Sequence, residues 1–549
     1  MLNGGEILVQ TLISRQVDTV FFVPGGTYTT VLRALSANAN AVRAVATRLE
    51  SSAVFAAEAY AAVRAKPACV FVSRAPGATN AAIGIHTAMQ ASRPVVLFVA
   101  NIPRALEQRE AFQEIDYQAM YAPIAKAVFD VQSFHDVARV TARALDLAIT
   151  GRPGPVVVSV SKDILDGETG EVPIPAPYRA PRGGPEAGAL EAAVAMLDRA
   201  RRPLLLAGEG VASEGEHAAL ERLAQASGAG VLAAYRQQDV FDNTHGAWIG
   251  QLTLNRTAHI TRALTECDLL LVLGSRLDSV TTADYTPFAP GQQRIMVHPE
   301  ASLFAQWQPD VAMLAHTGPA MRALSERVAA PDAARLAWRA ELNAAERASA
   351  SVGELHIHGD VNLAQVIAHF QRTVGEDAIL VSDAGTFGRW LQRYYRHTRP
   401  RTSLGPVSGA MGYGVPGGLG ASVAAPDARV FVWVGDGGFL MTGHECAAIV
   451  QEQLPVKIIV CDNAAWGSIL VHQNRRFQGW DFGTRLRSPD FTAMALAYGM
   501  QAFRVASTAA FADALHGAMQ HPGPALIHLL LDARDVSPYS GAALADAKD

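Results

Sequence analysis

With 549 residues, the chain is too long for a single hydrophobic core and is expected to form about two to four domains. Apolar residues make up 50% and charged residues 18%, so a large core can form without disulfides or a membrane. The net charge of −5 predicts no basic patch and argues against a nucleic-acid partner.

The first 15 residues carry an acid at Glu6 and no basic segment before an apolar core, so they predict an amphipathic helix rather than a signal peptide. No uncharged run approaches the ~18 residues that a membrane span needs. The cysteines are scattered without metal-site spacing and indicate buried thiols in a reducing cytoplasm, where we expect the protein to be located. They are Cys69, Cys267, Cys446 and Cys461.

Short apolar runs alternate with helix-length segments in the first third of the chain. The runs at 18–23, 68–73 and 94–100 are typical of a parallel sheet covered on both faces. Glu50 follows the run 41–47, where a strand is expected to end, and opens a helical pattern over 51–64. On position alone, Glu50 is a helix-start glutamate stabilised by the helix dipole.

Two further α/β sets follow a proline-rich segment at 172–185, which predicts an extended linker. The second set has candidate strands at 203–207, 268–274 and 294–298 and an alanine-rich helix near 333–350, and the third has candidate strands at 378–382, 430–434, 456–461 and 525–531. The pattern predicts an α/β fold of three doubly wound parallel-sheet domains. The expected boundaries are 1–171, 188–330 and 360–549, joined by a linker at 172–187 and a connecting helix and linker at 331–359.

Polar residues end two successive apolar runs of the third set. Asp436, Gly437 and Gly438 follow the first run, and Asp462 and Asn463 follow the second. The separation of 463 − 436 = 27 residues fits a right-handed βαβ crossover, whose two loops emerge at the same sheet edge. Such loops can hold Mg²⁺ through carboxylate and amide oxygens and a diphosphate through backbone amides. An ordinary βα turn is the alternative.

The stretch from Gly435 to Asn463 resembles the cofactor-anchoring motif of thiamine diphosphate enzymes. The resemblance extends over nearly the whole chain and is strongest to the acetohydroxyacid (acetolactate) synthase branch. It implies three domains (pyrimidine-binding, central and diphosphate-binding) and decarboxylation of a small-molecule 2-oxo acid with carboligation to a second carbonyl compound. A non-oxidative 2-oxo acid decarboxylase, or a C–C bond hydrolase or lyase with the same cofactor, is the alternative. The N-terminal motifs lie at 22–26, 48–50, 75–80, 111–114 and 161–163.

The resemblance implies a catalytic role for Glu50, as a carboxyl of raised pKa that shares a proton with N1′ of the cofactor's aminopyrimidine. Met411 matches the wedge under the bent cofactor, and Gly409 would offer its carbonyl to the 4′-amino group; core filler in a glycine-rich loop is the alternative for Met411. The implied metal ligands are Asp436, Asn463 and the carbonyl of Ala465, with Asp462 outside this set. The other implied cofactor contacts are Gly25, Pro76, Thr386, Phe387, Gly435, Gly437, Gly438, Trp466, Gly467 and Ser468.

Four further residues match substrate-pocket positions of the synthase branch. Phe112 and Gln113 match a pair that lines the pocket, Lys162 matches a pocket lysine, and Arg276 matches an arginine that engages the acceptor carboxylate. Their alternatives are loop packing, a surface amide, a solvated lysine and a strand-end salt bridge.

Departures from the synthase pattern leave the acceptor and the flavin open. His472 stands where synthases have a tryptophan that selects the larger acceptor. Residues 385–388 replace a Gln-His pair, and 249–254 replace a Gly-Met-His-Gly stretch. FAD, which synthase-like central domains hold, is left open because Glu209 interrupts the glycine run and would repel the flavin's charge. The resemblance also implies a homodimer or homotetramer with the active site at the subunit interface.

Overall fold

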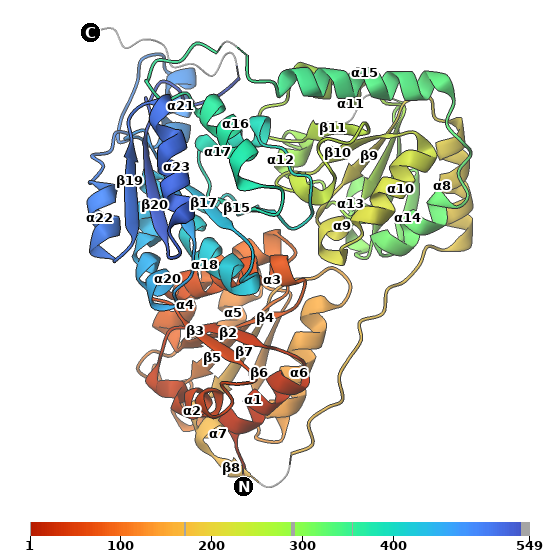
Figure 1. Ribbon diagram of the computed structural model, residues 1–549. Coiled ribbons are helices and arrows are strands. Elements are labelled where there is room, and N and C mark those ends of the chain that lie inside the picture. The colour runs from red at the N-terminus through yellow and green to blue at the C-terminus, as the bar shows by residue number, and fades with distance from the viewer. Residues whose placement is uncertain (1, 170–171, 287–290, 354, 540–549) are drawn as a thin grey trace. The chain divides into compact units, whose positions relative to one another are not determined.

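The computed structural model describes residues 2–169, 172–286, 291–353 and 355–539. Within these ranges the chain forms three six-stranded sheets with helices between the strands (Figure 1). Every neighbouring pair of strands in these three sheets runs parallel. The predicted α/β fold of three doubly wound parallel sheets is therefore confirmed.

The first sheet has the strand order β3-β2-β4-β5-β7-β6. Its strands are β2 (Thr19–Phe22), β3 (Arg43–Ala46), β4 (Ala68–Ser73), β5 (Val95–Asn101), β6 (Ala127–Val131) and β7 (Val156–Ser161). Its helices are α1 (Gly4–Ser14), α2 (Thr29–Ala37), α3 (Glu50–Arg64), α4 (Ala75–Gln90), α5 (Tyr117–Tyr121), α6 (Asp136–Ile149) and α7 (Lys162–Asp166). A separate antiparallel pair joins β1 (Leu2–Asn3) to β8 (Glu168–Thr169).

The central sheet has the order β11-β10-β9-β12-β13-β14. Its strands are β9 (Pro203–Ala207), β10 (Gly230–Ala233), β11 (Trp248–Gln251), β12 (Leu269–Leu273), β13 (Gln293–His298) and β14 (Val311–Leu314). Alternate residues of β9 pack into two separate hydrophobic clusters, so both faces are covered. The helices are α8 (Ala187–Arg199), α9 (Glu209–Glu214), α10 (His217–Ser227), α11 (Ala258–Glu266), α12 (Ser279–Thr282), α13 (Ser302–Trp307), α14 (Thr317–Ser325) and α15 (Ala333–Ser349).

The third sheet has the order β16-β15-β17-β18-β20-β19. Its strands are β15 (Ile379–Ser382), β16 (Ser403–Leu404), β17 (Val430–Gly435), β18 (Lys457–Asp462), β19 (Gln501–Val505) and β20 (Ala525–Leu530). The helices of this part of the chain are α16 (Leu363–Val374), α17 (Phe387–Tyr394), α18 (Gly414–Ala424), α19 (Asp436–Thr442), α20 (Cys446–Gln451), α21 (Gly467–Arg476), α22 (Phe491–Ala497) and α23 (Phe511–Gln520), with a 3₁₀ turn η4 at Gly443–Glu445.

The first and third sheets share one topology. If the strands of each sheet are numbered in chain order, both sheets read 2-1-3-4-6-5, whereas the central sheet reads 3-2-1-4-5-6. In all three, the strand order reverses beside the first strand of the sheet. In open parallel sheets, ligands bind at the carboxyl ends of the strands where the order reverses. The topology therefore identifies one candidate binding edge per sheet.

By compactness, the chain divides into two units. One contains 1–181, 406–427 and 440–456, and the other contains 182–405, 428–439 and 457–549. The predicted linker carries no helix or strand between 172 and 186, and α8 begins directly after it. The predicted three-domain boundaries stay a prediction.

The cysteines and the first helix agree with the sequence analysis. All four cysteines are free, buried thiols. The amphipathic helix expected in the first 15 residues is α1, whose N-cap Asn3 forms a capping box with Glu6. Among the described residues, we find no helix with the length and apolarity required to cross a bilayer.

Candidate functional site

Glu50 lies at the edge of the first sheet where the strand order reverses. It is the first residue of α3, and its carboxyl is half-buried. Asn80 Nδ2, from α4, donates a hydrogen bond of 2.9 Å to Glu50 Oε2. A Cβ added to Gly77 would lie 3.1 Å from Glu50 Oε1, so the missing side chain leaves room for the carboxyl. The residues that follow β3 and β4 thus hold this carboxyl from two sides.

Tyr28 and Gly25 line the same edge. Burial, and to a lesser extent the negative charge of Glu50, raise the pKa of the Tyr28 phenol well above its ordinary value, and its hydroxyl donates to the carbonyl of Val23. A Cβ on Gly25 would come within 2.8 Å of Ser73 Cβ and 2.9 Å of Tyr28 Cε1. Glycine is therefore required at 25 for close packing. Gly25 is among the candidates that the sequence predicts, whereas no sequence motif points to Tyr28.

The segment 111–114 reaches the start of α4. The carbonyl of Gln113 accepts a 3.3 Å hydrogen bond from Ala75 N, next to Pro76, and Gln113 has a φ of 66°. The side chain of Phe112 is 79% exposed, so it does not pack into the core of its loop within the described chain. Lys162 forms an ion pair with Asp166 inside α7 and remains partly exposed.

The segment that carries Met411 packs with α3. Gly409 and Gly412 have φ values of 75° and 82°, so the chain turns on both sides of the half-buried Met411. Beyond them, α18 lies so close to α3 that a Cβ on Gly420 would be 2.0 Å from the carbonyl oxygen of Ala56. The hydroxyl of Tyr413 also hydrogen-bonds to the buried carboxyl of Glu58 on α3.

A buried pair of acids lies at the corresponding edge of the third sheet. Asp436 opens α19 and is 3% exposed; burial first, and the charge of Asp462 next, raise its pKa to about 7. Burial alone would also raise the pKa of Asp462, but hydrogen bonds from His528 and Ser488 hold it below its ordinary value. His528 Nε2 lies 2.8 Å from Asp462 Oδ2, and Ser488 Oγ donates to Asp462 Oδ1 at 2.7 Å. The site therefore concentrates negative charge that a cation would offset.

The turn after Asp462 brings further predicted residues to this edge. Gly467 N donates a 2.8 Å hydrogen bond to Ala465 O, and Trp466 has φ −71° and ψ 71°, which is an inverse γ-turn. A Cβ on Gly467 would lie 3.0 Å from Thr386 Oγ1 and 3.1 Å from Asn463 Nδ2. Asn463, Thr386 and the start of α21 are therefore neighbours.

One glycine at this edge is explained by an aromatic neighbour. A Cβ on Gly437 would lie 2.2 Å from Trp466 Cζ3, whereas one on Gly435 would make an ordinary contact of 3.5 Å with Phe387 Cε1. Gly438 faces Asp383, whose Oδ2 would be 3.0 Å from an added Cβ. The sequence predicts that the glycines at 437 and 438 admit a diphosphate, whereas the contact that demands glycine at 437 is with the indole of Trp466.

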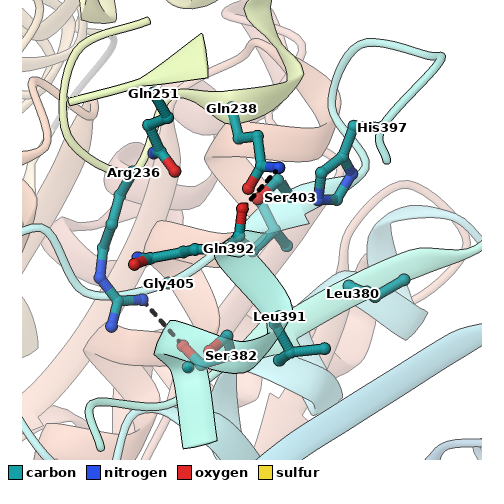
Figure 2. A pocket seen from close by; sticks show the side chains of 12 residues that line it. Arg236, Gln238, Gln251, Leu380, Ser382, Leu391, Gln392, His397, Ser403 and Gly405 are labelled. Carbon is teal, nitrogen blue, oxygen red and sulfur yellow. Dashed lines mark hydrogen bonds between the residues drawn. The ribbon is translucent and has the colours of Figure 1, made fainter. Parts of the chain in front are cut away.

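An arginine missed by the sequence analysis holds the loop after β15. Figure 2 shows Arg236 reaching to the carbonyl of Ser382. Its Nη1 donates to Ser382 O at 3.1 Å and its Nη2 donates to Asp383 O at 3.2 Å, beside a cavity of about 30 Å³. A Cβ on Gly405 would lie 2.0 Å from Arg236 Nη1, so glycine there leaves the space that the guanidinium occupies.

The corresponding edge of the central sheet is closed. Gly208 N donates to Leu273 O at 2.9 Å, and Gly210 N donates to Gly274 O at 2.8 Å, so the loops after β9 and β12 are joined. Arg276 Nε donates to the buried Glu209 carboxylate at 2.8 Å. The strand-end salt bridge, which was the alternative for Arg276, is present.

The remaining candidates lie on α21. His472 is exposed there, and Ser468 is the second residue of the helix. Among the described residues, no group of three or more His, Cys, Asp and Glu side chains could hold a metal ion. A metal at Asp436 would therefore need amide or carbonyl oxygens as further ligands, as Asn463 and Ala465 can provide.

Three family models match the chain, one over each sheet. They are described as the thiamine pyrophosphate enzyme N-terminal TPP binding domain (residues 2–120), central domain (190–324) and C-terminal TPP binding domain (383–529). The chain is 30% identical to the acetolactate synthase large subunit of Parasynechococcus marenigrum, covering 96% of this chain and 87% of the relative. It is 31% identical to the acetolactate synthase large subunit of Corynebacterium glutamicum, covering 92% and 82%. It is 29% identical to the chloroplastic acetolactate synthase of Arabidopsis thaliana, covering 96% and 81%.

Proposed function

The chain belongs to the thiamine pyrophosphate enzyme family, and we propose that it decarboxylates a 2-oxo acid and joins the remaining fragment to a second carbonyl compound. The names of its relatives, acetolactate synthases of bacteria and plants, support this reaction. The observation that carries the proposal is the contact of Asn80 with Glu50 at the reversal point of the first sheet. The buried Asp436 at the same point of the third sheet supports it independently.

The third-sheet edge fits a diphosphate with its Mg²⁺. Burial first, and the charge of Asp462 next, raise the pKa of Asp436 to about 7, so a divalent ion bound there would offset the negative charge of the two acids. Asp436, the amide of Asn463 and the second lone pair of the Ala465 carbonyl are oxygen donors of the kind that Mg²⁺ takes. Backbone N–H groups at the starts of α19 and α21 would face the phosphates. We propose these residues as the metal and diphosphate site, with Thr386 and Phe387 beside it.

The first-sheet edge fits the aminopyrimidine. Glu50 is held by Asn80 on one oxygen, and its other oxygen lies against Gly77, where an added Cβ would be 3.1 Å away. A fixed carboxyl of this kind can hand a proton to a ring nitrogen and take it back. When bound, thiamine diphosphate supplies a carbon nucleophile and accepts the electron pair that decarboxylation releases. We propose that Gly409 and Met411 contact the cofactor, and that Pro76 and Gly25 shape the edge.

Condensation requires a pocket that excludes water and orients the acceptor. The exposed ring of Phe112 offers apolar surface for this purpose, and Gln113 and Lys162 offer polar groups. Arg276 is a weaker candidate for binding the acceptor carboxylate, because Glu209 already neutralises its guanidinium at 2.8 Å.

The central domain does not fit a flavin. A flavin diphosphate would need the reversal point between β9 and β12, where the joined loops and the Glu209–Arg276 pair lie. The buried Glu209 carboxylate would also repel the phosphates. We propose that the protein works without FAD.

Release of an aldehyde is the second candidate outcome. His472 is exposed on α21, and an imidazole there can donate the proton that ends the reaction without condensation.

We also propose a homodimer or homotetramer with the site at the subunit interface, on family resemblance. Light scattering would test this, since an active monomer contradicts it.

The decisive experiment incubates the protein with thiamine diphosphate, Mg²⁺ and a panel of 2-oxo acids and identifies products by mass. With pyruvate as the substrate, condensation joins two molecules with loss of one CO₂ and gives a five-carbon hydroxy-oxo acid. Detection of this product would support condensation. Acetaldehyde and CO₂ alone would favour the second candidate. No turnover with any 2-oxo acid, despite bound cofactor, would overturn the proposal.

A further inference from the structure

We infer that Glu445 is the positioning residue that holds Glu50 in place. This inference rests on the proposed role of Glu50 at the cofactor. It concerns a carboxylate that lies 397 residues along the chain from Arg48, beyond the reach of any local sequence motif.

Glu445 holds the two residues that come directly before Glu50. Its Oε1 accepts hydrogen bonds from the backbone N–H of Arg48, at 2.9 Å, and of Leu49, at 3.1 Å. The side chain of Arg48 is held in addition, because its Nη2 donates to Gln451 Oε1 at 2.7 Å. The segment 445–451 thus fixes the backbone that leads into the catalytic carboxyl.

The N-cap residue of α3 provides no side-chain cap. This residue is Leu49, which is extended, with φ −144° and ψ 142°, and cannot cap the helix through its side chain. The negative charge of Glu445 lies near the positive end of the helix dipole, which favours it there. Without Glu445, two backbone donors would lose their partner beside the first residue of α3.

This anchor is costly, which argues that it is more than a helix cap. Glu445 is fully buried, at 0% exposure, and its Oε2 has no hydrogen-bond partner among the described residues. An unsatisfied buried acceptor costs roughly 1–3 kcal/mol, and more when it is charged. A serine or asparagine at 49 would cap the helix without that cost. What the carboxylate adds is a rigid attachment of Glu50 to the segment 440–456, in the same compact unit.

The central domain offers a matched control. Glu214 makes an equivalent pair of contacts at the start of α14, where its two oxygens accept from Thr317 N and Gly318 N at 3.0 Å each. Glu214→Ala removes a similar carboxylate–backbone anchor from a helix that carries none of the proposed cofactor residues. Glu445→Gln is the conservative variant, because its amide oxygen can accept the same two hydrogen bonds.

Two readouts separate positioning from general stability. Hydrogen–deuterium exchange measured on the peptide that spans 44–55 reports whether the amides of Arg48 and Leu49 are held, and it needs no cofactor. Exchange of the C2 proton of bound thiamine diphosphate, followed by NMR, reports the proton transfer that depends on Glu50, and it needs no substrate.

Glu445→Ala should expose the amides of 48 and 49 and slow C2 proton exchange at least ~10-fold, a smaller loss than the ~10²–10⁴-fold expected for removal of Glu50 itself. Glu445→Gln should restore most of both signals, and Glu214→Ala should leave both unchanged. Wild-type C2 exchange in Glu445→Ala, or an equal loss in Glu214→Ala, would overturn the inference. If the wild-type protein catalyses C2 exchange but turns over no 2-oxo acid, the proposed reaction fails while this inference stands.

Discussion

Asn80 Nδ2 donates a 2.9 Å hydrogen bond to Glu50 Oε2, so the amide of one helix fixes the carboxyl that opens another. Asn80→Ala removes that donor and lets the carboxyl rotate, while the rest of the edge is unchanged. One such hydrogen bond contributes about 1–1.5 kcal/mol, and the loss of this energy from the transition state lowers kcat ~10-fold. We expect only a small change in thermal stability. Steady-state kinetics with the best 2-oxo acid, together with a thermal melt, measure both.

Asn80→Asp is a second variant that tests the same contact more strongly, because a second carboxylate beside Glu50 disfavours the ionised form of Glu50. It should lower kcat further than Asn80→Ala does. Equal activity of the wild type and both variants would show that Asn80 does not hold the carboxyl of Glu50 in the geometry that turnover needs.

Asp436→Ala should abolish the stabilisation that Mg²⁺ and thiamine diphosphate give together. For the wild type, ligand at ~100 times Kd adds about 2.7 kcal/mol to the free energy of unfolding, and the variant should lose nearly all of it. Thermal melts with and without the two ligands, and after chelation by EDTA, measure this. Asp377→Ala, at an exposed acid, is the control. If the variant keeps the full ligand-dependent rise in melting temperature, Asp436 is not a ligand of the proposed metal.

The purified protein should carry no flavin. The Glu209–Arg276 ion pair and the joined loops at 208–210 and 274–276 occupy the position that the flavin diphosphate needs. Absorbance of the native protein and of the supernatant after heat denaturation, with and without added FAD, tests this. One equivalent of released flavin per chain would contradict the prediction.

His397 makes stability depend on pH. Burial lowers the pKa of its imidazole to about 3 in the folded protein, whereas the unfolded chain has the ordinary value of 6.5. Between these two values the unfolded state binds the additional proton, so stability falls as pH falls through this window, by up to ~1.4 kcal/mol per pH unit. Urea unfolding of the wild type and His397→Gln at pH ~7 and ~5 should show a shallower loss for the variant. Parallel losses would contradict the assignment.

Gly420→Ala should destabilise the packing of α18 against α3. The added methyl group would lie 2.0 Å from the carbonyl oxygen of Ala56, which is backbone and cannot turn away. Overpacking of this kind costs about 1–3 kcal/mol. Gly246→Ala, where nothing lies within 4 Å of the added Cβ, is the control, and urea unfolding compares the two. Equal stability of the two variants would mean that the helices can separate at little cost.

Several of the strands that the sequence predicts are buried on both faces. The runs at 68–73 and 203–207 coincide with β4 and β9, because a central parallel strand is apolar throughout. The edge strands β6 and β19 were missed, since their half-exposed residues break the apolar run. The two-residue β16 is too short for any periodic signal.

For the site, the sequence identifies residues that follow strand ends and misses those that meet across the fold. Asp436, Gly437 and Asn463 follow strand ends, where chain order and sheet topology bring them to one edge. Arg236 contacts Ser382, 146 residues away, and no local pattern links them. Arg276 also shows the limit of motif matching, because its ion pair with Glu209 becomes visible only when two strands lie side by side.

The shared 2-1-3-4-6-5 strand order makes the first and third sheets two versions of one scaffold. The loop after the third strand of that order begins with Arg74 and Ala75 in one version and with Asp436 and Gly437 in the other. Equivalent loops of the two sheets therefore differ in chemistry, and under the proposed function one serves an organic ring and the other serves an ion with its phosphates. A hybrid that placed the 436–437 loop on the first sheet would carry its ligand preference along only if Trp466, which packs on Gly437, moved with it.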